Sequence, residues 1–253
     1  MFAPLLVAEG LTVRFGGVHA LDNVSFMAGE GEIIGLIGPN GAGKTTLFSS
    51  LVGLQSLRAG RVVLSGRTVS GMRPHRIASF GMTKTFQNTA LFPDMTVLEN
   101  VLTAMLLRRD LRSAKNEALG ILDRLGLSRI ATRDVADLTF PQKALVEMAR
   151  ALATQPKVLL LDEVMAALTP SEMDEVMQII RELRDEGLTL LIVEHHMRAI
   201  MSLCDRILVL NFGQLIAEGP PRKITNDQAV IEAYLGHGAT YGEGLADRAC
   251  HAA

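Results

Sequence analysis

One segment near the start of the chain restricts the possible folds more than any other. An apolar run from Ile33 to Ile37 leads directly into Gly38-Pro39-Asn40-Gly41-Ala42-Gly43-Lys44-Thr45-Thr46, and a stretch with helical character follows. This order supplies the complete GxxxxGK[ST] pattern between a strand and a helix, which is the setting that the pattern requires. The segment therefore predicts an α/β fold with a phosphate-binding loop.

The residue types of this loop have a chemical purpose. Glycines let the backbone curl, so that several N–H groups and the N-terminus of the following helix face one anion. Lys44 adds a positive charge for the β and γ phosphates, and Thr45 supplies a hydroxyl to Mg²⁺. We expect residues 38–46 to bind a nucleoside triphosphate, although a Gly-rich turn before a helix is the structural alternative. The motif alone does not separate a GTPase, a kinase and a transport ATPase.

Apolar segments elsewhere in the chain predict a P-loop NTPase core with a mixed, mainly parallel sheet. Runs rich in Ile, Val and Leu alternate with helical patterns, as in a sheet of parallel strands covered by helices. The opening segments and the turn at Asn211-Phe212-Gly213 predict an additional antiparallel β portion. The expected strands are Leu11 to Phe15, Val24 to Phe26, Ile33 to Ile37, Arg61 to Leu64, Val158 to Asp162, Thr189 to Glu194 and Arg206 to Leu210.

Strand signals stop between residues 96 and 154, where apolar residues recur at helical spacing. This predicts a helical subdomain inserted into a discontinuous nucleotide-binding core of residues 1–95 and 155–236. Residues 237–253 have several glycines and little apolar periodicity, so we expect a mobile C-terminal tail.

Charge and composition disfavour a nucleic-acid surface, a secretory signal and a membrane-spanning helix. The net charge of −2 shows no excess of base, so we expect no nucleic-acid partner. The first residues lack the features of a secretory signal, and the apolar runs are shorter than the roughly 20 residues of a membrane-spanning helix. Cys204 and Cys250 match no metal-ligand spacing, so we expect unpaired thiols in a reducing compartment.

A second acidic element follows the apolar strand that begins at Val158. The strand ends in Asp162 and Glu163. We expect Asp162 to hold Mg²⁺ through water and Glu163 to polarise the attacking water. The alternative is a strand that simply ends in surface acids.

The order of these motifs resembles the nucleotide-binding domain of an ABC transporter. LIGPNGAGKTT is followed by TFQN with Gln87, then by LLLDE, and then by IVEHHM with His195, and the resemblance extends to about residue 236. It implies that Gln87 bridges Mg²⁺ and the transporter contact, and that His195 contacts the γ-phosphate and helps hold Glu163 and water in line. Without this order, Gln87 would be interpreted as a surface residue and His195 as a buried histidine.

The family also stacks an aromatic ring on adenine at the place of Phe15, and Val18 would pack beside the base. Core packing is the alternative for Phe15. A guanine site would need an Asn-Lys-x-Asp run, which the sequence does not contain. ATP with Mg²⁺ is the expected ligand.

Within the family, the sequence is most similar to the ATPases of importers of branched-chain and other hydrophobic amino acids. Three stretches carry this similarity: FGGVHALDNVSF, TFQNTALFPDMTVLENV and VLNFGQLIAEGPPRKITNDQAVIEAYLG. The resemblance implies a second ATPase subunit, identical or related, in a head-to-tail dimer. It also implies integral-membrane permease subunits, a periplasmic binding protein acting indirectly, and a cytoplasmic location on the inner face of the membrane. Three alternatives stay open: a regulatory module with slow turnover, an ABC ATPase that serves a different cargo, and a soluble ABC ATPase acting on nucleic acid or ribosomes.

Two segments depart from the family pattern. The signature Leu-Ser-Gly-Gly-Gln, or its Leu-Ser-Tyr-Gly-Gln variant, would meet the γ-phosphate bound by the opposite subunit. Here the segment contains Thr139, Pro141 and Gln142, so the hydroxyl and the amide are kept. Pro141 has no N–H to offer an anion. Thr169 stands where relatives place Asp or Asn, in a loop that normally passes between subunits.

Overall fold

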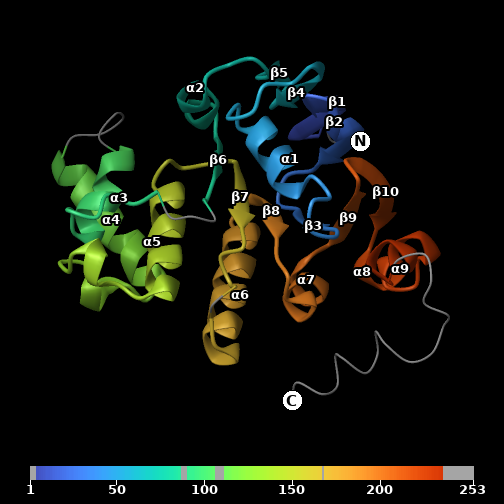
Figure 1. Ribbon diagram of the computed structural model, residues 1–253. Coiled ribbons are helices and arrows are strands. Elements are labelled where there is room, and N and C mark those ends of the chain that lie inside the picture. Colours follow the sequence, from blue (N-terminus) through green and yellow to red (C-terminus); the bar gives the residue numbers. More distant parts are fainter. Residues whose placement is uncertain (1–3, 87–89, 106–110, 167, 236–253) are drawn as a thin grey trace.

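The computed structural model describes residues 4–86, 90–105, 111–166 and 168–235. In this part of the chain, six strands form one sheet in the order β10-β9-β3-β8-β7-β6 (Figure 1). Neighbouring strands are parallel except for β10, which pairs antiparallel to β9. The mixed, mainly parallel sheet is therefore confirmed. Its strands are β3 Ile33–Ile37, β6 Met82–Lys84, β7 Val158–Asp162, β8 Thr189–Val193, β9 Arg206–Asn211 and β10 Gln214–Gly219.

The central strands are buried on both faces. Every residue of β3, β7 and β8 is buried, because successive side chains point to opposite faces and both faces are covered. Ile33 packs into one hydrophobic cluster and Ile34, the next residue, into the other. This is why the sequences of these strands are continuously apolar and do not alternate between apolar and polar residues.

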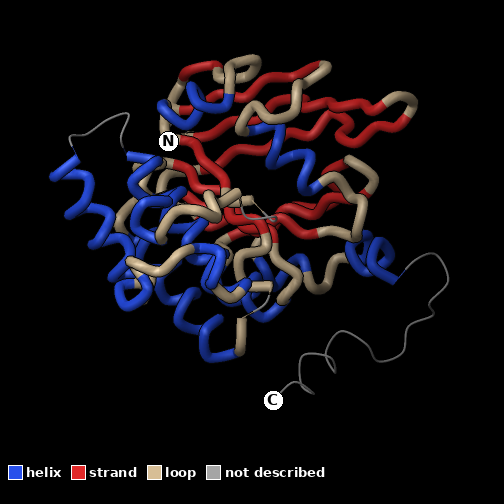
Figure 2. The backbone as a smooth tube through the Cα atoms, turned by 60° about the vertical axis from the view of Figure 1, so that its left-hand side comes forward, coloured by secondary structure: helices blue, strands red, loops and turns tan. Residues whose placement is uncertain are grey.

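A second sheet is antiparallel, with the strand order β2-β1-β4-β5. Its strands are β1 Leu6–Phe15, β2 Val18–Ala28, β4 Ala59–Leu64 and β5 Arg67–Thr68. Leu6 and Leu11 of this sheet share a hydrophobic cluster with Phe48 of helix α1, Lys44–Leu51. Figure 2 shows this sheet as a separate red layer above the central one. The predicted antiparallel portion is confirmed.

Apart from α1 and α2, the helices lie beside or below the central sheet (Figure 1). Helices α3, α4 and α5 stand together at the β6 side of the molecule, and they occupy the stretch for which the sequence predicts helices. Short 3₁₀ turns at Ser128–Ile130 and Val135–Asp137 precede α5. The α-helices not yet given are α2 Pro74–Ser79, α3 Val97–Met105, α4 Leu111–Arg124, α5 Phe140–Leu152, α6 Pro170–Asp185, α7 Met197–Leu203, α8 Pro221–Ile224 and α9 Gln228–Leu235. Among the residues that the structure describes, none of the helices has the length and apolar character needed to cross a bilayer.

All seven predicted strands are found, and those of the antiparallel sheet are longer than predicted. The sequence did not predict β5 and β6, since both are short and polar and give no apolar run. Glu194, the last residue of the predicted strand Thr189 to Glu194, lies just beyond β8. Cys204 is buried without a disulfide, and Cys250 lies outside the described residues.

Candidate active site

The phosphate-binding loop begins where β3 ends, and two of its glycines are required by close packing. A Cβ on Gly38 would lie 2.1 Å from the carbonyl oxygen of Leu210, and one on Gly43 would lie 2.5 Å from that of Ala20. Gly43 also has a φ of 106°, in the left-handed region that side chains disfavour. The loop is therefore held between strand β9 and the β1–β2 hairpin.

Helix α1 presents an open N-terminus to this loop. Its N-cap residue, Gly43, makes no side-chain cap hydrogen bond, and no acidic residue stands in the first turn. Thr45 is exposed at the second helical position. Backbone N–H groups at a helix start that lack a cap, together with the positive end of the helix dipole, favour a bound anion.

Lys44 lies in the loop that it is predicted to serve. Its Nζ atom donates hydrogen bonds to the carbonyl oxygens of Gly38, at 2.7 Å, and Pro39, at 3.1 Å. Burial lowers the pKa of Lys44, and the charges of Glu163 and Asp162 act in the opposite direction. The ammonium group is thus a desolvated positive charge at the phosphate loop.

Asp162 ends β7 and is almost completely buried. Its backbone N–H donates to Oγ1 of Thr85 at 2.9 Å, and its Oδ2 atom lies 3.3 Å from Nζ of Lys84. Its Oδ1 atom has no hydrogen-bond partner among the described residues. Burial raises the pKa of Asp162, whereas the charge of Lys84 lowers it. A buried carboxylate oxygen without a partner is a position that a cation could take.

Glu163, the next residue, has a left-handed backbone with a φ of 55°. Such a conformation costs a non-glycine residue roughly 1–2 kcal/mol and is concentrated at functional sites. Its N–H donates to the carbonyl oxygen of Val193 at 2.9 Å, and its Oε1 atom lies 2.9 Å from Nε2 of His195. The Glu163 side chain is 17% exposed and that of His195 52%. Two of the three predicted catalytic side chains, Glu163 and His195, are therefore brought together at an open surface.

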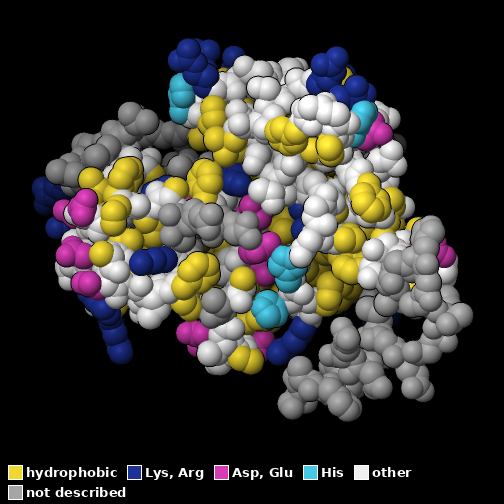
Figure 3. All heavy atoms as spheres, in the orientation of Figure 1, with side chains coloured by type: hydrophobic (Ala, Val, Ile, Leu, Met, Phe, Trp, Pro, Cys, Tyr) yellow, Lys and Arg dark blue, Asp and Glu magenta, His cyan; other side chains and the backbone are white. Residues whose placement is uncertain are grey.

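Glu194 is a site residue that the sequence analysis missed. Its Oε1 atom accepts the N–H of Met165 at 2.8 Å, which ties the loop after Glu163 to the end of β8. Burial raises the pKa of Glu194 to about 7, and its Oε2 atom has no partner in the described part of the chain. A carboxylate next to His195 within an apolar strand end was the available signal. Figure 3 shows acidic and histidine side chains adjoining near the middle of this face.

Phe15 and Val18 face each other across the end of the β1–β2 hairpin. Phe15 is 52% exposed and Val18 is 68% exposed, so neither is a core residue. An exposed aromatic ring and an exposed aliphatic side chain can form an apolar platform for a planar base. Gln87, the remaining predicted site residue, lies outside the described residues.

The signature segment forms the start of α5. Thr139 is the N-cap: its Oγ1 accepts the N–H of Gln142 at 3.4 Å, and Oε1 of Gln142 accepts the N–H of Thr139 at 3.1 Å. This reciprocal capping box engages both polar side chains. Pro141 occupies the second helical position and offers no N–H. Among the described residues, the N–H of Gln142 is bonded to Thr139 and that of Lys143 to the carbonyl oxygen of Thr139, which leaves the N–H of Phe140 as the donor of this first turn without a hydrogen bond.

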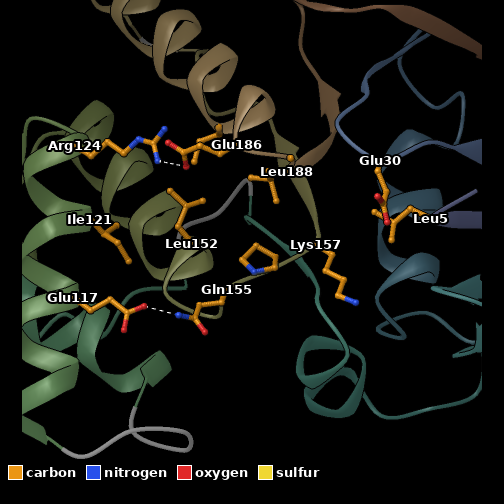
Figure 4. Close-up of a pocket in the computed structure, with 13 residues that line it drawn as sticks. Leu5, Glu30, Glu117, Ile121, Arg124, Leu152, Gln155, Lys157, Glu186 and Leu188 are labelled. Carbon is orange, nitrogen blue, oxygen red and sulfur yellow. Dashed lines mark hydrogen bonds and ion pairs between the residues drawn. The ribbon is translucent and has the colours of Figure 1, made fainter.

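Two cavities of similar volume differ in their relation to the predicted site. One, of about 590 Å³, is bordered by Pro39, Asn40, Gly41 and Ala42 of the phosphate loop and by residues of α9. The other, of about 520 Å³, lies between α4, α6 and the end of α5. Across it Glu117 contacts Gln155 and Arg124 contacts Glu186 (Figure 4). This second cavity contains none of the predicted site residues.

A family model described as "ABC transporter" matches residues 21–166. The chain belongs to the ABC transporter family. A second model, "Branched-chain amino acid ATP-binding cassette transporter", matches residues 214–240 of this ABC protein. The ATPase prediction is confirmed as well, because ABC ATP-binding proteins hydrolyse ATP to power transport.

Curated relatives match nearly the whole ABC chain. The high-affinity branched-chain amino acid transport ATP-binding protein LivG of Salmonella typhimurium is 42% identical, over 93% of this chain and 99% of its own length. BraF of Pseudomonas aeruginosa, with the same description, is 38% identical with the same coverage. LptB of Escherichia coli, a lipopolysaccharide export system ATP-binding protein, is 34% identical over 91% of this chain and 97% of its own.

Solved ABC structures share the fold. The ADP conformation of MJ1267, an ATP-binding cassette of an ABC transporter, superposes with a TM-score of 0.85 and 31% identity, over 93% of this chain and all of that one. A dimeric bacterial ABC transporter cassette, MJ0796, has a TM-score of 0.79 and 26% identity, over 86% of this chain and 99% of its own. The P-loop NTPase fold predicted from the sequence is confirmed.

Proposed function

We propose that this ABC protein is the ATPase subunit of an importer for branched-chain or other hydrophobic amino acids. The observation that carries the proposal is the match of residues 214–240 to a family model specific to branched-chain amino acid transporters. The ABC match alone would not select this cargo, since LptB, described as an export protein, is also more than 30% identical. The matched residues begin β10 and include α8 and α9, and α9 borders the cavity beside the phosphate loop.

We assign the site residues as follows. Phe15 and Val18 stack against adenine, residues 38–46 enclose the phosphates, and Lys44 leaves its two carbonyl partners to neutralise the β and γ phosphates. Glu163 accepts a proton from the attacking water, and His195 holds the Glu163 carboxylate in place and contacts the γ-phosphate. Gln87 bridges Mg²⁺ and the surface that contacts the transporter's membrane subunits.

The residues present also fit Mg²⁺, which prefers oxygen ligands and keeps several waters. Thr45 offers an exposed hydroxyl and Asp162 offers the Oδ1 atom that lacks a partner, and Gln87 would be a third ligand. Among the described residues there is no group of three His, Cys, Asp or Glu side chains that could hold a metal alone. Phosphate oxygens would therefore complete the site. When bound, the ion would neutralise charge on the phosphates during transfer.

We propose that two such ATPases form a head-to-tail dimer, in which Thr139, Pro141 and Gln142 of each subunit face the ATP of the other. The dimeric cassette MJ0796 supports the dimer, with identical or related subunits. Residues 96–154 would act as a helical subdomain that transmits closure to permease subunits, with residues 1–95 and 155–236 as the core. A periplasmic binding protein would deliver the cargo, and the ATPase would lie on the cytoplasmic face of the membrane.

One observation favours a second candidate, a module that closes on ATP and turns over slowly. Pro141 removes an N–H from the helix start that would meet the γ-phosphate of the partner. The phosphate loop, Asp162 and Glu163 of this chain still supply the groups that ATP binding requires.

The experiment that tests the proposal is reconstitution in liposomes with the cognate permease and binding protein, with ATP enclosed. Uptake of labelled leucine and release of phosphate are measured together. We expect leucine to stimulate both, and Lys44→Ala to abolish tight ATP binding and uptake, because the loop loses its cation against a polyanion. ATP turnover that responds to another cargo but not to leucine, isoleucine or valine would overturn the assignment. Saturable ATP binding with turnover below detection would favour the second candidate.

A further inference from the structure

We propose that Lys84 is the resident counter-ion of Asp162, holding one carboxylate oxygen so that the other stays open for a divalent cation. The inference rests on the proposed function, in which Asp162 serves Mg²⁺. It concerns a residue to which neither the sequence motifs nor the family match gives a role.

The fold brings the two residues together from distant parts of the chain. Strand β6 pairs in parallel with β7, and the register places Lys84 beside Leu160, two residues before Asp162. Thr85, the next residue of the same segment, accepts the N–H of Asp162. Lys84 thus holds the side chain of Asp162, and the next residue, Thr85, holds its backbone.

The ion pair of Lys84 and Asp162 is buried. The side chain of Lys84 is 6% exposed and that of Asp162 is 1% exposed. In the described part of the chain, the Lys84 ammonium makes its hydrogen bond to Oδ2 of Asp162, at 3.3 Å, and lies 5.1 Å from the centre of the Phe86 ring. A charge as buried as this would be strongly destabilising without its partner. Each ion therefore depends on the other when no ligand is bound.

The two carboxylate oxygens are used differently. Oδ2 faces Lys84, whereas Oδ1 is buried and has no partner among the described residues. A lysine carries a compact point charge and can leave the second oxygen free, whereas a guanidinium is shaped to engage both. When a divalent cation takes Oδ1, it provides a second counter-charge for the same carboxylate. The dependence of Asp162 on Lys84 should then decrease.

The test compares the thermal unfolding of the wild-type chain and Lys84→Met, a substitution that keeps apolar volume and removes the charge. Each is measured without ligand, with a non-hydrolysable ATP analogue and EDTA, and with the analogue and Mg²⁺. Without ligand, we expect Lys84→Met to lower the Tm by about 6 to 20 °C, because Asp162 is left buried and unpaired. With Mg²⁺ and the analogue, the difference should fall to less than half, whereas with EDTA it should persist.

Lys157→Met is the matched control, since Lys157 is an exposed lysine directly before β7. It should change the Tm little and equally in all three conditions. If Lys84→Met does not fold, the double variant Lys84→Met with Asp162→Asn provides the test, because it removes both charges. The double variant should fold, and the stabilising effect of Mg²⁺ on its analogue complex should be lost.

Three outcomes decide the matter. A Tm difference between wild type and Lys84→Met that is the same in all conditions would show that Lys84 only stabilises the fold. The absence of any difference would show that Asp162 needs no counter-ion. A wild-type chain that Mg²⁺ and the analogue fail to stabilise would instead contradict the proposed function, so the two failures are distinguishable.

Discussion

The Nε2 atom of His195 lies 2.9 Å from Oε1 of Glu163. Glu163 follows β7 directly and His195 comes two residues after β8, and these strands pair in parallel with Asp162 opposite Val193. Because parallel strands end at the same edge of a sheet, the pairing places both side chains together beyond it. The contact is thus a consequence of strand register.

Glu163→Gln should retain ATP but lose at least about 100-fold of the turnover, since an amide cannot accept the proton of the attacking water. Asp162 and Lys44 remain, so nucleotide binding should persist. Phosphate release in the assembled transporter and binding of labelled ATP measure the two effects. Undiminished phosphate release would remove Glu163 from its assigned role.

His195→Ala should lower turnover strongly and ATP affinity only modestly, because it releases the Glu163 carboxylate and removes one γ-phosphate contact. The neighbouring His196→Ala is the control, as the structure shows no side-chain cap hydrogen bond from His196 to α7. Steady-state ATPase assays separate kcat from KM. Equal losses in the two variants would indicate general disturbance of this loop instead.

Pro141→Gly should raise turnover, because it restores an N–H and backbone freedom at the second position of α5. One missing donor costs about 2–4 kcal/mol of transition-state stabilisation, a rate loss of tens to several hundredfold. With a related partner that has an unaltered signature, the gain should occur at the partner-bound ATP. In a homodimer it should occur at both sites.

The capping box provides the control for this variant. Thr139 and Gln142 bond each other in the first turn, so Pro141→Gly should leave the helix start in place, as circular dichroism can verify. Single-turnover assays with ATP saturating then measure each site. If neither assembly becomes faster while folding is intact, the altered signature does not limit hydrolysis.

Glu194 should make stability depend on pH. Its pKa is about 7 in the folded protein against an ordinary value of 4.5, because burial and the charges of Glu163 and Asp162 disfavour ionisation more than two backbone hydrogen bonds favour it. The folded state therefore binds the proton more tightly. The stability linked to that proton is complete below pH 4.5 and is lost as the pH rises through 7, on the order of 3 kcal/mol in total.

Glu194→Gln lacks this titration, so the free energy of unfolding of the variant minus that of the wild type should increase from pH 5 to pH 8. Urea unfolding at both pH values measures the difference. The glutamine oxygen can still accept the N–H of Met165, which preserves the loop contact. A difference that does not change with pH would mean that Glu194 ionises as it does in the unfolded chain.

Sequence reasoning was most successful where chemistry is local. The phosphate loop needs neighbouring residues only, and the continuous apolar runs of β3, β7 and β8 follow from burial on both faces. It missed β6 because three residues with a central threonine and a terminal lysine give no apolar run. The capping box of Thr139 and Gln142 follows the Thr-x-x-Gln pattern, which predicts a helix N-terminus at this position.

The phosphate loop and the acidic strand end could be predicted from sequence because each consists of residues that are adjacent along the chain. The family followed from the order of several such short motifs. Two contacts between distant residues became visible only in the folded chain: the ion pair of Lys84 with Asp162, and the hydrogen bond from the N–H of Met165 to Glu194. The contact of Glu163 with His195, which the resemblance implied, has its geometry from the same strand pairing. Those contacts depend on the register of β6, β7 and β8, and a shift of one residue would turn each side chain to the opposite face. Register is set by the packing of two hydrophobic clusters on the two faces of the sheet, which no short segment of sequence contains.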